Sequence, residues 1–339
     1  MSEKIEILIT LPFREDHIEK LTKLSPRLSI RLIRTWAAED IVDEVWEKIE
    51  ILYTDQVLPT PKQVPNLRWI QFHWAGISHA LEQPILQKSD LIITTLSGAA
   101  ASKVAEYIVL LILAFGHHLA SILAYQRKAD WPGDRWERFQ PRELRGSTVG
   151  IVGYGSIGRQ AARLLTSFGA EVLATKQNAM DPEDHGYTAQ GWGDAQGDFI
   201  RRIYPPEALT WMVKECDFVV VTAPLTSGTN NVIDEAVFEA MKPSAYLIDV
   251  SRGGIVDHQA LIHAIKDRQL AGAALDVFPK EPLPADSPLW KLPNVIISPH
   301  VAGITPDYDD RAVELFAENI QRYLNGQPLY NLFSHERGY

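Results

Sequence analysis

Short apolar runs alternate with helix-like patterns along the first hundred residues of the chain. Five runs rich in Ile, Leu, Val and aromatic residues are typical of buried strands: residues 5–10, 28–33, 49–53, 69–72 and 91–95. Between them, residues 18–24 and 38–48 carry apolar side chains at the i, i+3, i+4 spacing of helices. This alternation predicts a parallel sheet with helices on its faces.

A second alternating series begins at residue 148, after a long apolar pattern from about residue 103 to Gly116 that predicts a buried helix. Its predicted strands are residues 148–152, 171–174, 218–222, 246–250, 272–277 and 295–298. The connection 175–206 is long, rich in Gly, Asp and Gln, and of unknown role. Thr305-Pro306-Asp307 is typical of a helix start with a capping threonine, and Asn325-Gly326 of its end.

The two series predict an α/β protein with two doubly wound parallel-sheet domains and a cleft between them. Residues 1–102 with 303–339 are expected to form a smaller, flavodoxin-like domain, and residues 103–302 a Rossmann-type domain. Residues 126–147 interrupt the pattern with Trp131 and Trp136 in a charged stretch. We expect a surface arm there that contacts another subunit.

Composition narrows the class of protein. The 339 residues carry 43 acidic and 33 basic side chains, a net charge of −10, so nucleic acid is not expected as a partner. The single cysteine, Cys216, excludes an internal disulfide and fits a reducing compartment. The start lacks the pattern of a signal peptide, and the longest apolar run, 107–115, is too short to span a membrane. We expect a cytoplasmic protein.

A glycine-rich turn lies between a predicted strand and a predicted helix. Residues 149–152 lead into Gly153-Tyr154-Gly155-Ser156-Ile157-Gly158, and a helical pattern continues to Phe168. In such a fingerprint the glycines allow a tight turn, close approach of a pyrophosphate and close helix–strand packing. The helix N-terminus offers N–H groups to the phosphates. This context predicts dinucleotide binding.

The next strand ends without the acidic residue that usually accepts hydrogen bonds from the ribose of NAD. It reads Thr175-Lys176-Gln177, and Lys176 favours NADP because its charge suits a 2′-phosphate. The alternative is that Lys176 is an ordinary surface lysine and that both NAD and NADP are accepted.

Three charged segments follow predicted strands of the second series. They are Asp249-Val250-Ser251-Arg252-Gly253-Gly254, Asp276-Val277-Phe278-Pro279-Lys280-Glu281-Pro282 and Ser298-Pro299-His300-Val301-Ala302-Gly303. Ligands of open α/β sheets bind beyond the carboxyl ends of the strands. The segments therefore place Arg252, Glu281 and His300 at neighbouring strand ends, where ligands are expected.

The order and spacing of these segments resemble the D-isomer-specific 2-hydroxyacid dehydrogenase family over almost the whole chain. The resemblance implies hydride transfer between NAD or NADP and a small 2-keto or 2-hydroxy acid. It implies that Arg252 binds the substrate carboxylate, that His300 is the acid–base group, and that Glu281 orients His300. Histidine suits this role because its charge changes near neutral pH. The resemblance also makes the smaller domain the substrate domain and implies a homodimer held by the long helix and the arm.

Further site residues follow from the same resemblance. Those implied at the cofactor, besides the fingerprint glycines Gly153, Gly155 and Gly158 and Lys176, are Ser156, Ile157, Ala223, Val250, Ser251, Asp276 and Gly303. The loop 69–77 is similar to one whose backbone amides receive the substrate carboxylate, here from Gly76 and Ile77. His73 and Trp74 either contribute to substrate specificity or pack the strand end.

Two other functions remain open. Relatives of this fold include transcriptional corepressors that bind NAD, so a nucleotide-sensing protein is the alternative to an enzyme. Phosphite dehydrogenase is a third possibility, whereas Glu281 argues against a formate dehydrogenase, which carries glutamine there. No metal site is predicted. His117 and His118 lie near the end of the long helix, but no second pair with metal-ligand spacing accompanies them. The other histidines lie in polar stretches and are expected to be exposed: His17, His79, His185, His258, His263 and His335.

Overall fold

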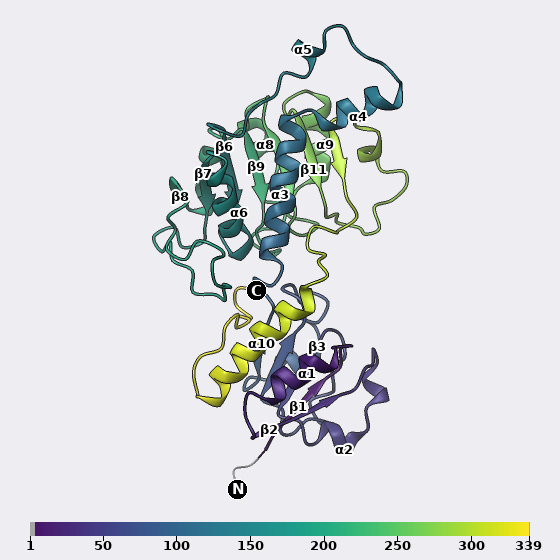
Figure 1. The fold of residues 1–339 in the computed structure, drawn as a ribbon, viewed down its shortest axis with the longest axis vertical. Helices are drawn as coiled ribbons and strands as arrows, with labels where there is room; N and C mark the ends of the chain where they lie inside the picture. Colours follow the sequence, from purple (N-terminus) through teal and green to yellow (C-terminus); the bar gives the residue numbers. More distant parts are fainter. Residues whose placement is uncertain (1–3, 339) are drawn as a thin grey trace. The chain divides into compact units, whose positions relative to one another are not determined.

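Two separate parallel sheets organise the chain in the computed structural model, which describes residues 4–338 (Figure 1). One unit extends to Ala99 and resumes at Thr305, and the other spans Ala100–Ile304. These boundaries lie within three residues of the domain limits expected from the sequence. Each unit is described by itself below.

The first unit contains a five-stranded parallel sheet of order β2-β1-β3-β4-β5, as in flavodoxin-like folds. Its strands are β1 (Ile5–Ile9), β2 (Leu28–Leu32), β3 (Ile51–Thr54), β4 (Trp69–Phe72) and β5 (Ile92–Thr94). β3 and β4 are buried along their whole length, which explains why their sequences are continuous apolar runs without alternation.

Segments far apart in the sequence complete the core of this unit. Its helices are α1 (Glu15–Thr22), α2 (Asp43–Trp46) and α10 (Tyr308–Leu324), with 3-10 turns η1 (Ala38–Asp40) and η2 (Pro84–Gln87). The ring of Phe316 on α10 is fully buried, with its centroid 4.8 Å from Tyr53 and 5.3 Å from Trp69. Tyr323 stacks on Trp69 at 5.5 Å. The C-terminal helix is therefore part of the core that the N-terminal strands form.

The second unit contains a seven-stranded parallel sheet of order β12-β11-β10-β9-β6-β7-β8. From β8 to β11 this is the 3-2-1-4-5-6 order of dinucleotide-binding folds, with β12 added at one edge. The strands are β6 (Thr148–Val152), β7 (Glu171–Thr175), β8 (Arg202–Tyr204), β9 (Phe218–Val221), β10 (Tyr246–Asp249), β11 (Gly272–Leu275) and β12 (Val295–Ile297). The chain reverses its direction of winding between β6 and β9, where such folds bind their ligands.

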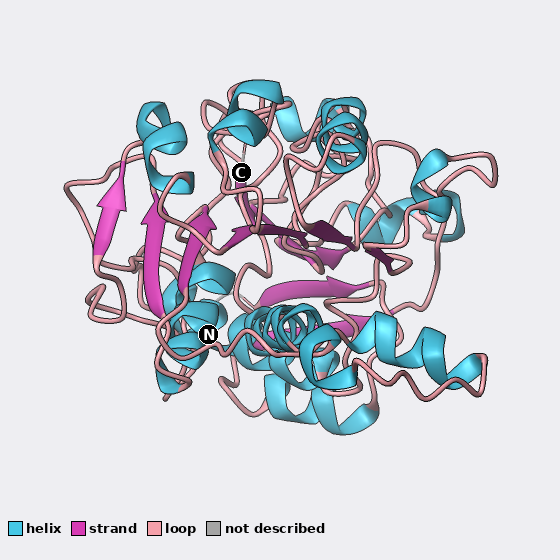
Figure 2. Ribbon diagram, turned by 90° about the horizontal axis from the view of Figure 1, so that it is seen from above, coloured by secondary structure: helices cyan, strands magenta, loops and turns pink. Residues whose placement is uncertain are grey.

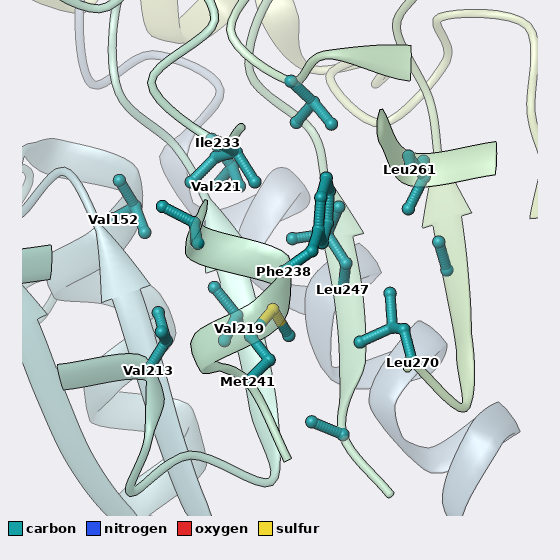
Figure 3. Close-up of a cluster of buried hydrophobic side chains, with 14 of the residues drawn as sticks. Val152, Val213, Val219, Val221, Ile233, Phe238, Met241, Leu247, Leu261 and Leu270 are labelled. Atoms are coloured by element: carbon teal, nitrogen blue, oxygen red, sulfur yellow. The ribbon is translucent and has the colours of Figure 1, made fainter. Parts of the chain in front are cut away.

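Helices cover both faces of this sheet, and each face has its own apolar core (Figure 2). Val219 and Leu247 pack with Phe238 and Met241 on one face (Figure 3), whereas Val220 and neighbouring side chains pack against α3 and α6 on the other. The helices are α3 (Ala101–Gly116), α4 (Leu119–Arg127), α5 (Arg135–Arg138), α6 (Ser156–Ser167), α7 (Leu209–Val213), α8 (Glu235–Ala240) and α9 (His258–Lys266), with 3-10 turns η3 (Pro206–Ala208) and η4 (Pro288–Lys291).

Within residues 4–338, no single helix has both the length and the apolar content of a membrane span. Only α3 and α4 taken together, with a 63° bend between them, have both properties.

The expected helix 38–48 is wrong as a continuous element. Ile41 and Val42 adopt extended backbone conformations that separate η1 from α2. The side chain of Asp40 accepts a hydrogen bond from the hydroxyl of Thr35 at 2.5 Å, and Ile41 is buried. Tertiary burial of the β-branched Ile41 therefore overrides the helical spacing.

Two other expectations need correction. The last helix begins at Tyr308 rather than at Thr305, and its N-cap, Asp307, makes no side-chain capping bond. The hydroxyl of Thr305 instead accepts a bond from the Asp307 N–H at 3.4 Å within the preceding loop. The connection 175–206 contains an unpredicted strand, β8, which is only three residues long and forms the sheet edge.

Candidate active site

The segment that carries Arg252 begins at the last residue of β10, and those that carry Glu281 and His300 begin directly after β11 and β12. These three strands are neighbours and run parallel, so the segments leave the sheet at the same edge. The structure therefore brings the three charged motifs to the carboxyl edge of the sheet, as expected from the sequence. This is the edge at which doubly wound sheets bind ligands.

His300 and Glu281 form a direct pair. The imidazole Nδ1 lies 2.8 Å from Oε2 of Glu281, and Oε1 accepts the N–H of Phe278 at 2.9 Å. Burial opposes the ionisation of Glu281, but these two bonds and the nearby charges hold its pKa below the usual value. An ionised carboxylate only accepts, so Nδ1 of His300 must be the protonated nitrogen. Nε2 is then the atom left for acid–base chemistry, on a side chain that is 47% exposed.

Asp276 fixes the turn on which His300 lies. Its buried carboxylate accepts bonds from the hydroxyl of Ser298 at 2.6 Å and from the N–H groups of Val301 at 3.0 Å and Ala302 at 2.9 Å. His300 itself has a φ of +54°, a left-handed conformation that is costly for a residue with a side chain. The surrounding hydrogen bonds therefore hold His300 in a strained backbone position.

Arg252 interacts electrostatically with the Glu281–His300 pair. Its Nη1 donates to the Ser251 carbonyl at 2.8 Å, and its positive charge contributes to the lowered pKa of Glu281. Arg252, Glu281 and His300 thus form one electrostatic group with two basic residues and one acid. Such a group suits a small anion that must be held and protonated.

The glycine-rich turn has the geometry of a pyrophosphate cradle. Gly153 has a φ of +99°, and a Cβ there would lie 2.7 Å from the backbone of Ala223. At Gly158 a Cβ would meet the Gly153 carbonyl oxygen at 2.6 Å, whereas at Gly155 it would point into open space. The first and third glycines are thus required by packing, and the second leaves room for a ligand.

Helix α6 starts at this turn with the predicted residues Ser156 and Ile157 in its first turn. Its N-cap, Gly155, has no side chain that could accept the N–H groups which every helix leaves at its start. The N–H groups at a helix start and the positive end of the helix dipole suit the phosphates of a dinucleotide. The residues present therefore fit a nicotinamide dinucleotide, with Gly153, Gly155 and Gly158 at its pyrophosphate.

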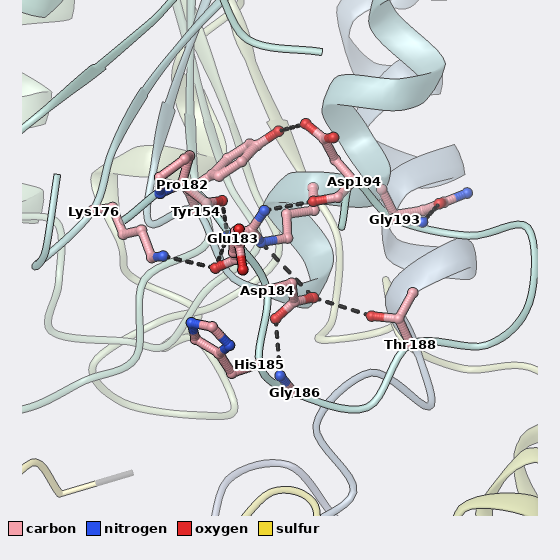
Figure 4. A network of polar contacts seen from close by, with 12 residues as sticks. Tyr154, Lys176, Pro182, Glu183, Asp184, His185, Gly186, Thr188, Gly193 and Asp194 are labelled. Atoms are coloured by element: carbon pink, nitrogen blue, oxygen red, sulfur yellow. Dashed lines mark hydrogen bonds and ion pairs between the residues drawn. The ribbon is translucent and has the colours of Figure 1, made fainter. Parts of the chain in front are cut away.

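Lys176 lies at the end of β7 and holds the long connection in place (Figure 4). Its ammonium donates to the backbone carbonyls of Asp181 and Glu183, the latter at 2.9 Å. The carboxylate of Asp181 is farther away, at 3.9 Å. Partial burial and the charge of Arg159 lower the pKa of Lys176. The side chain is thus ordered by neutral acceptors more than by an ion pair.

The structure also reveals a polar network that the sequence did not predict. Arg159, one residue after the fingerprint, is 1% exposed and donates to the carbonyls of Asp194, Pro182 and Glu183 at 2.5, 2.7 and 2.9 Å. The hydroxyl of Tyr154 donates to Asp194 at 2.5 Å (Figure 4). The sequence does not mark Arg159 as buried, because the same helix carries a second arginine, Arg163, and several other polar residues. The network fastens the connection to the fingerprint helix.

The other residues predicted at the cofactor lie around the same sheet edge. Val250 and Ser251 are buried directly after β10, and Ala223 lies against Gly153. Gly303 lies near the start of α3, where its Cβ would be 3.7 Å from Ala100. Contact of these residues with a cofactor stays a prediction.

The structure favours the packing interpretation for His73 in the first unit. The imidazole is 6% exposed, and its Nδ1 lies 2.9 Å from the hydroxyl of Tyr53. Burial lowers the pKa of His73 to about 4. Its neighbour Trp74 is 44% exposed and packs against Tyr308, with centroids 4.9 Å apart. Of the two specificity candidates, Trp74 is the one that is open to a ligand.

Gly76 and Ile77 follow this strand end. Ile77 buries its side chain in the apolar core, so only its backbone is available for binding. Among the hydrogen bonds of residues 4–338, the N–H groups of Gly76 and Ile77 donate to no protein acceptor. Two adjacent amides without a partner are suited to a carboxylate.

His17 is buried, contrary to the expectation from its polar surroundings. Its Nε2 lies 2.8 Å from Asp310, and Asp16 is close enough for the three residues to resemble a metal-ligand cluster. The guanidinium of Arg14 bonds Asp16 at 3.0 Å and Asp310 at 2.6 Å. The chain's own arginine therefore supplies the positive charge between these two carboxylates.

Comparison with known proteins adds independent information. The family model described as "D-isomer specific 2-hydroxyacid dehydrogenase, NAD binding domain" matches residues 109–302. A glyoxylate reductase from Thermofilum pendens is 34% identical over 268 residues, covering 78% of this chain and 74% of that protein. An (S)-sulfolactate dehydrogenase from Chromohalobacter salexigens is 33% identical, covering 77% of this chain and 78% of that protein.

Solved structures show the same similarity over the full length. A D-isomer specific 2-hydroxyacid dehydrogenase from Xanthobacter autotrophicus, crystallised with NADPH and MES, matches with a TM-score of 0.79 and 26% identity. The match covers 100% of this chain and 100% of that chain. A family protein from Aeromonas salmonicida matches with a TM-score of 0.77 and 27% identity, covering 98% of this chain and 99% of that one.

Proposed function

The chain belongs to the D-isomer specific 2-hydroxyacid dehydrogenase family, and from this premise we propose that it reduces a small 2-keto acid to the D-2-hydroxy acid. The observation that carries the proposal is the Glu281–His300 pair beside Arg252 at the edge of a dinucleotide-type sheet. Reduction of a ketone requires a proton at oxygen as the hydride reaches carbon. The pair supplies the proton donor, and the sheet supplies the place for the dinucleotide.

Each charged group has a distinct role in this proposal. Glu281 keeps the Nδ1 proton of His300 in place, so that Nε2 delivers its proton to the carbonyl oxygen. Arg252 binds the substrate carboxylate with its planar guanidinium and polarises the adjacent carbonyl. A nicotinamide dinucleotide, when bound, supplies the hydride. In the first unit, the proposed carboxylate donors are the N–H groups of Gly76 and Ile77.

Small 2-keto acids such as glyoxylate, hydroxypyruvate and pyruvate are the proposed substrates. No cluster of Arg or Lys surrounds the loop 69–77, so a phosphate-binding pocket is not indicated there. Relatives that carry the name glyoxylate reductase support the same class.

NADP(H) is the proposed cofactor, although NAD(H) fits the same cradle. The tip of β7 offers no carboxylate to a ribose, and Lys176 lies directly after the strand. Because its ammonium is held by carbonyl oxygens, its charge is not cancelled by a close ion pair.

A turnover panel tests the function. The purified protein, mixed with NADPH or NADH and glyoxylate, hydroxypyruvate, pyruvate, 2-ketobutyrate or oxaloacetate, should consume reduced nicotinamide, followed by its absorbance. His300→Ala should lower kcat by about 10²- to 10⁴-fold, the usual contribution of an acid–base group. The exposed His263→Ala is the matched control and should keep full activity. Tight cofactor binding without any turnover would instead favour the nucleotide-sensing function or phosphite oxidation.

The pH dependence tests Glu281. During oxidation of the hydroxy acid, His300 must be neutral to accept the proton, and a neighbouring carboxylate favours its charged form. Glu281→Gln should therefore move the acidic limb of kcat/KM for oxidation to lower pH, by about one unit. Glu281→Asp, which keeps the charge, is the control. An unchanged pH profile in Glu281→Gln would remove Glu281 from this role.

The cofactor ratio tests Lys176. Loss of one charged contact to a 2′-phosphate should lower kcat/KM for NADPH about tenfold in Lys176→Ala, equivalent to about 1.4 kcal/mol. The value for NADH should change little. Lys62→Ala, at an exposed position of the first unit, is the control. Equal losses with both cofactors would show that Lys176 only holds the connection, and the NADP preference would be rejected.

The arm between α4 and β6 is the proposed contact with a second copy of the chain. Trp131 and Trp136 are 82% and 78% exposed, and Ile122 and Leu123 of α4 are partly exposed nearby in the sequence. Several large apolar side chains exposed within one short stretch of the chain are typical of a subunit interface. We expect a homodimer in sedimentation velocity, and a shift toward the monomer in the Trp131→Ser/Trp136→Ser variant. A wild-type protein that sediments as a monomer would contradict the proposal.

A further inference from the structure

Asp249 is a buried carboxyl group whose chemistry is not explained by the roles described so far. It is the last residue of β10 and is 0% exposed. Its Oδ1 accepts the N–H of Ser251 at 3.0 Å and also the Ser251 hydroxyl. Its Oδ2 is enclosed and has no hydrogen-bond partner among the described residues. Arg252, the proposed carboxylate-binding residue, directly follows the serine that Asp249 holds.

A buried anion needs either a positive partner or several donors, and Asp249 has neither at Oδ2. The donors that it does have are neutral and come from one residue. The strand neighbours offer no cation, since β9 ends in Val220 and Val221. Ile248 and Val250, on either side of Asp249 in the chain, pack into the apolar core beside α3. An ionised Asp249 would therefore be poorly stabilised.

Asp276, directly after the neighbouring strand β11, has a different environment from Asp249. Its N–H donates to the carbonyl oxygen of Asp249 at 2.9 Å, so the two residues lie side by side. Asp276 takes all three donors of the His300 turn, which stabilise its negative charge. That charge in turn disfavours a second anion at Asp249. Two adjacent carboxyl groups thus have environments that favour opposite protonation states.

The expected titration follows from these surroundings. Burial raises the pKa of Asp249 to about 7, the bonds from Ser251 oppose the increase, and the charge of Asp276 adds to it. Of the charged groups in residues 4–338, Asp276 is the one that contributes to this shift. Asp249 is therefore mostly protonated below neutral pH, and it loses its proton as the pH rises above its pKa of about 7.

We propose that Asp249 is a protonated positioning residue, whose neutral carboxyl group holds the Ser251 turn so that Arg252 can bind the substrate carboxylate. Its acceptor oxygen holds the N–H and hydroxyl of Ser251, and its proton removes the negative charge that would otherwise lie between Asp276 and this turn. Ionisation adds a second buried anion beside Asp276, which destabilises the turn that carries Arg252. The inference rests on the proposed role of Arg252, because that role gives the turn its function.

The first test uses the wild-type holoenzyme and needs no turnover. With ¹³C-labelled aspartate carboxyls, one carboxyl resonance should titrate near neutral pH, and Asp249→Asn should remove it. Ordinary aspartates titrate near pH 4, so the signal is distinct. If every aspartate resonance titrates below about pH 5, the inference is overturned, even if Asp249→Asn does not fold.

The second test separates the position of Arg252 from the chemistry of His300. In the His300→Gln background, which should not turn over, binding of glyoxylate to the NADPH complex is measured by protein fluorescence at pH 6 and pH 9. The Kd should rise at least about tenfold, because a group with a pKa near 7 is almost fully deprotonated at pH 9. In His300→Gln/Asp249→Asn, which cannot ionise at this position, the Kd should stay constant.

The controls distinguish the two possible failures. His300→Gln/Asp267→Asn, altered at an aspartate outside the site, should keep the pH dependence of the parent variant. A pH dependence that persists without Asp249 would overturn its positioning role. The absence of keto-acid binding at every pH would instead contradict the proposed function itself.

Discussion

A parallel sheet that is buried on both faces leaves little room for polar chemistry except at the ends of its strands. The second unit obeys this constraint, because apolar side chains pack against helices on either side of β9, β10 and β11. The charged residues of the site therefore follow the strands and do not interrupt them. Their mutual positions are determined by strand order, which places β10, β11 and β12 next to one another. The site is in this sense a product of the topology.

Hydrogen bonds from the turns to carboxyl groups then hold the charged residues of the site in position. Asp276 binds three donors of the His300 turn, Glu281 binds Nδ1 of His300, and Asp249 binds Ser251 before Arg252. Each acid holds a different turn, and its burial, its donors and its charged neighbours together decide whether it carries a charge. Three carboxyl groups at one edge of a sheet can thus serve three purposes. Residue type alone does not distinguish them.

The sequence predicted those parts of the protein that depend on local pattern. The apolar runs predicted eleven strands, β1–β7 and β9–β12, nearly to the residue. The glycine-rich turn predicted α6, because its first and third glycines are required by local packing. Contacts between distant segments were the source of the failures at Ile41, Arg159 and His17. Ile41 is extended because it is buried in a core that no local pattern reveals. Arg159 can be buried because it donates to carbonyls more than twenty residues away. His17 can be buried because it pairs with a carboxylate on the last helix.

The first unit is built from two segments at opposite ends of the chain, which has a consequence for how it folds during synthesis. Its core is completed by Phe316, which lies between Tyr53 and Trp69 although it is synthesised more than 240 residues after them. The nucleotide-type unit, by contrast, is continuous from Ala100 to Ile304. On the ribosome the middle of the chain can therefore reach its native core before the beginning does. The earliest strands must wait, with their apolar side chains exposed, until the last helix has been translated.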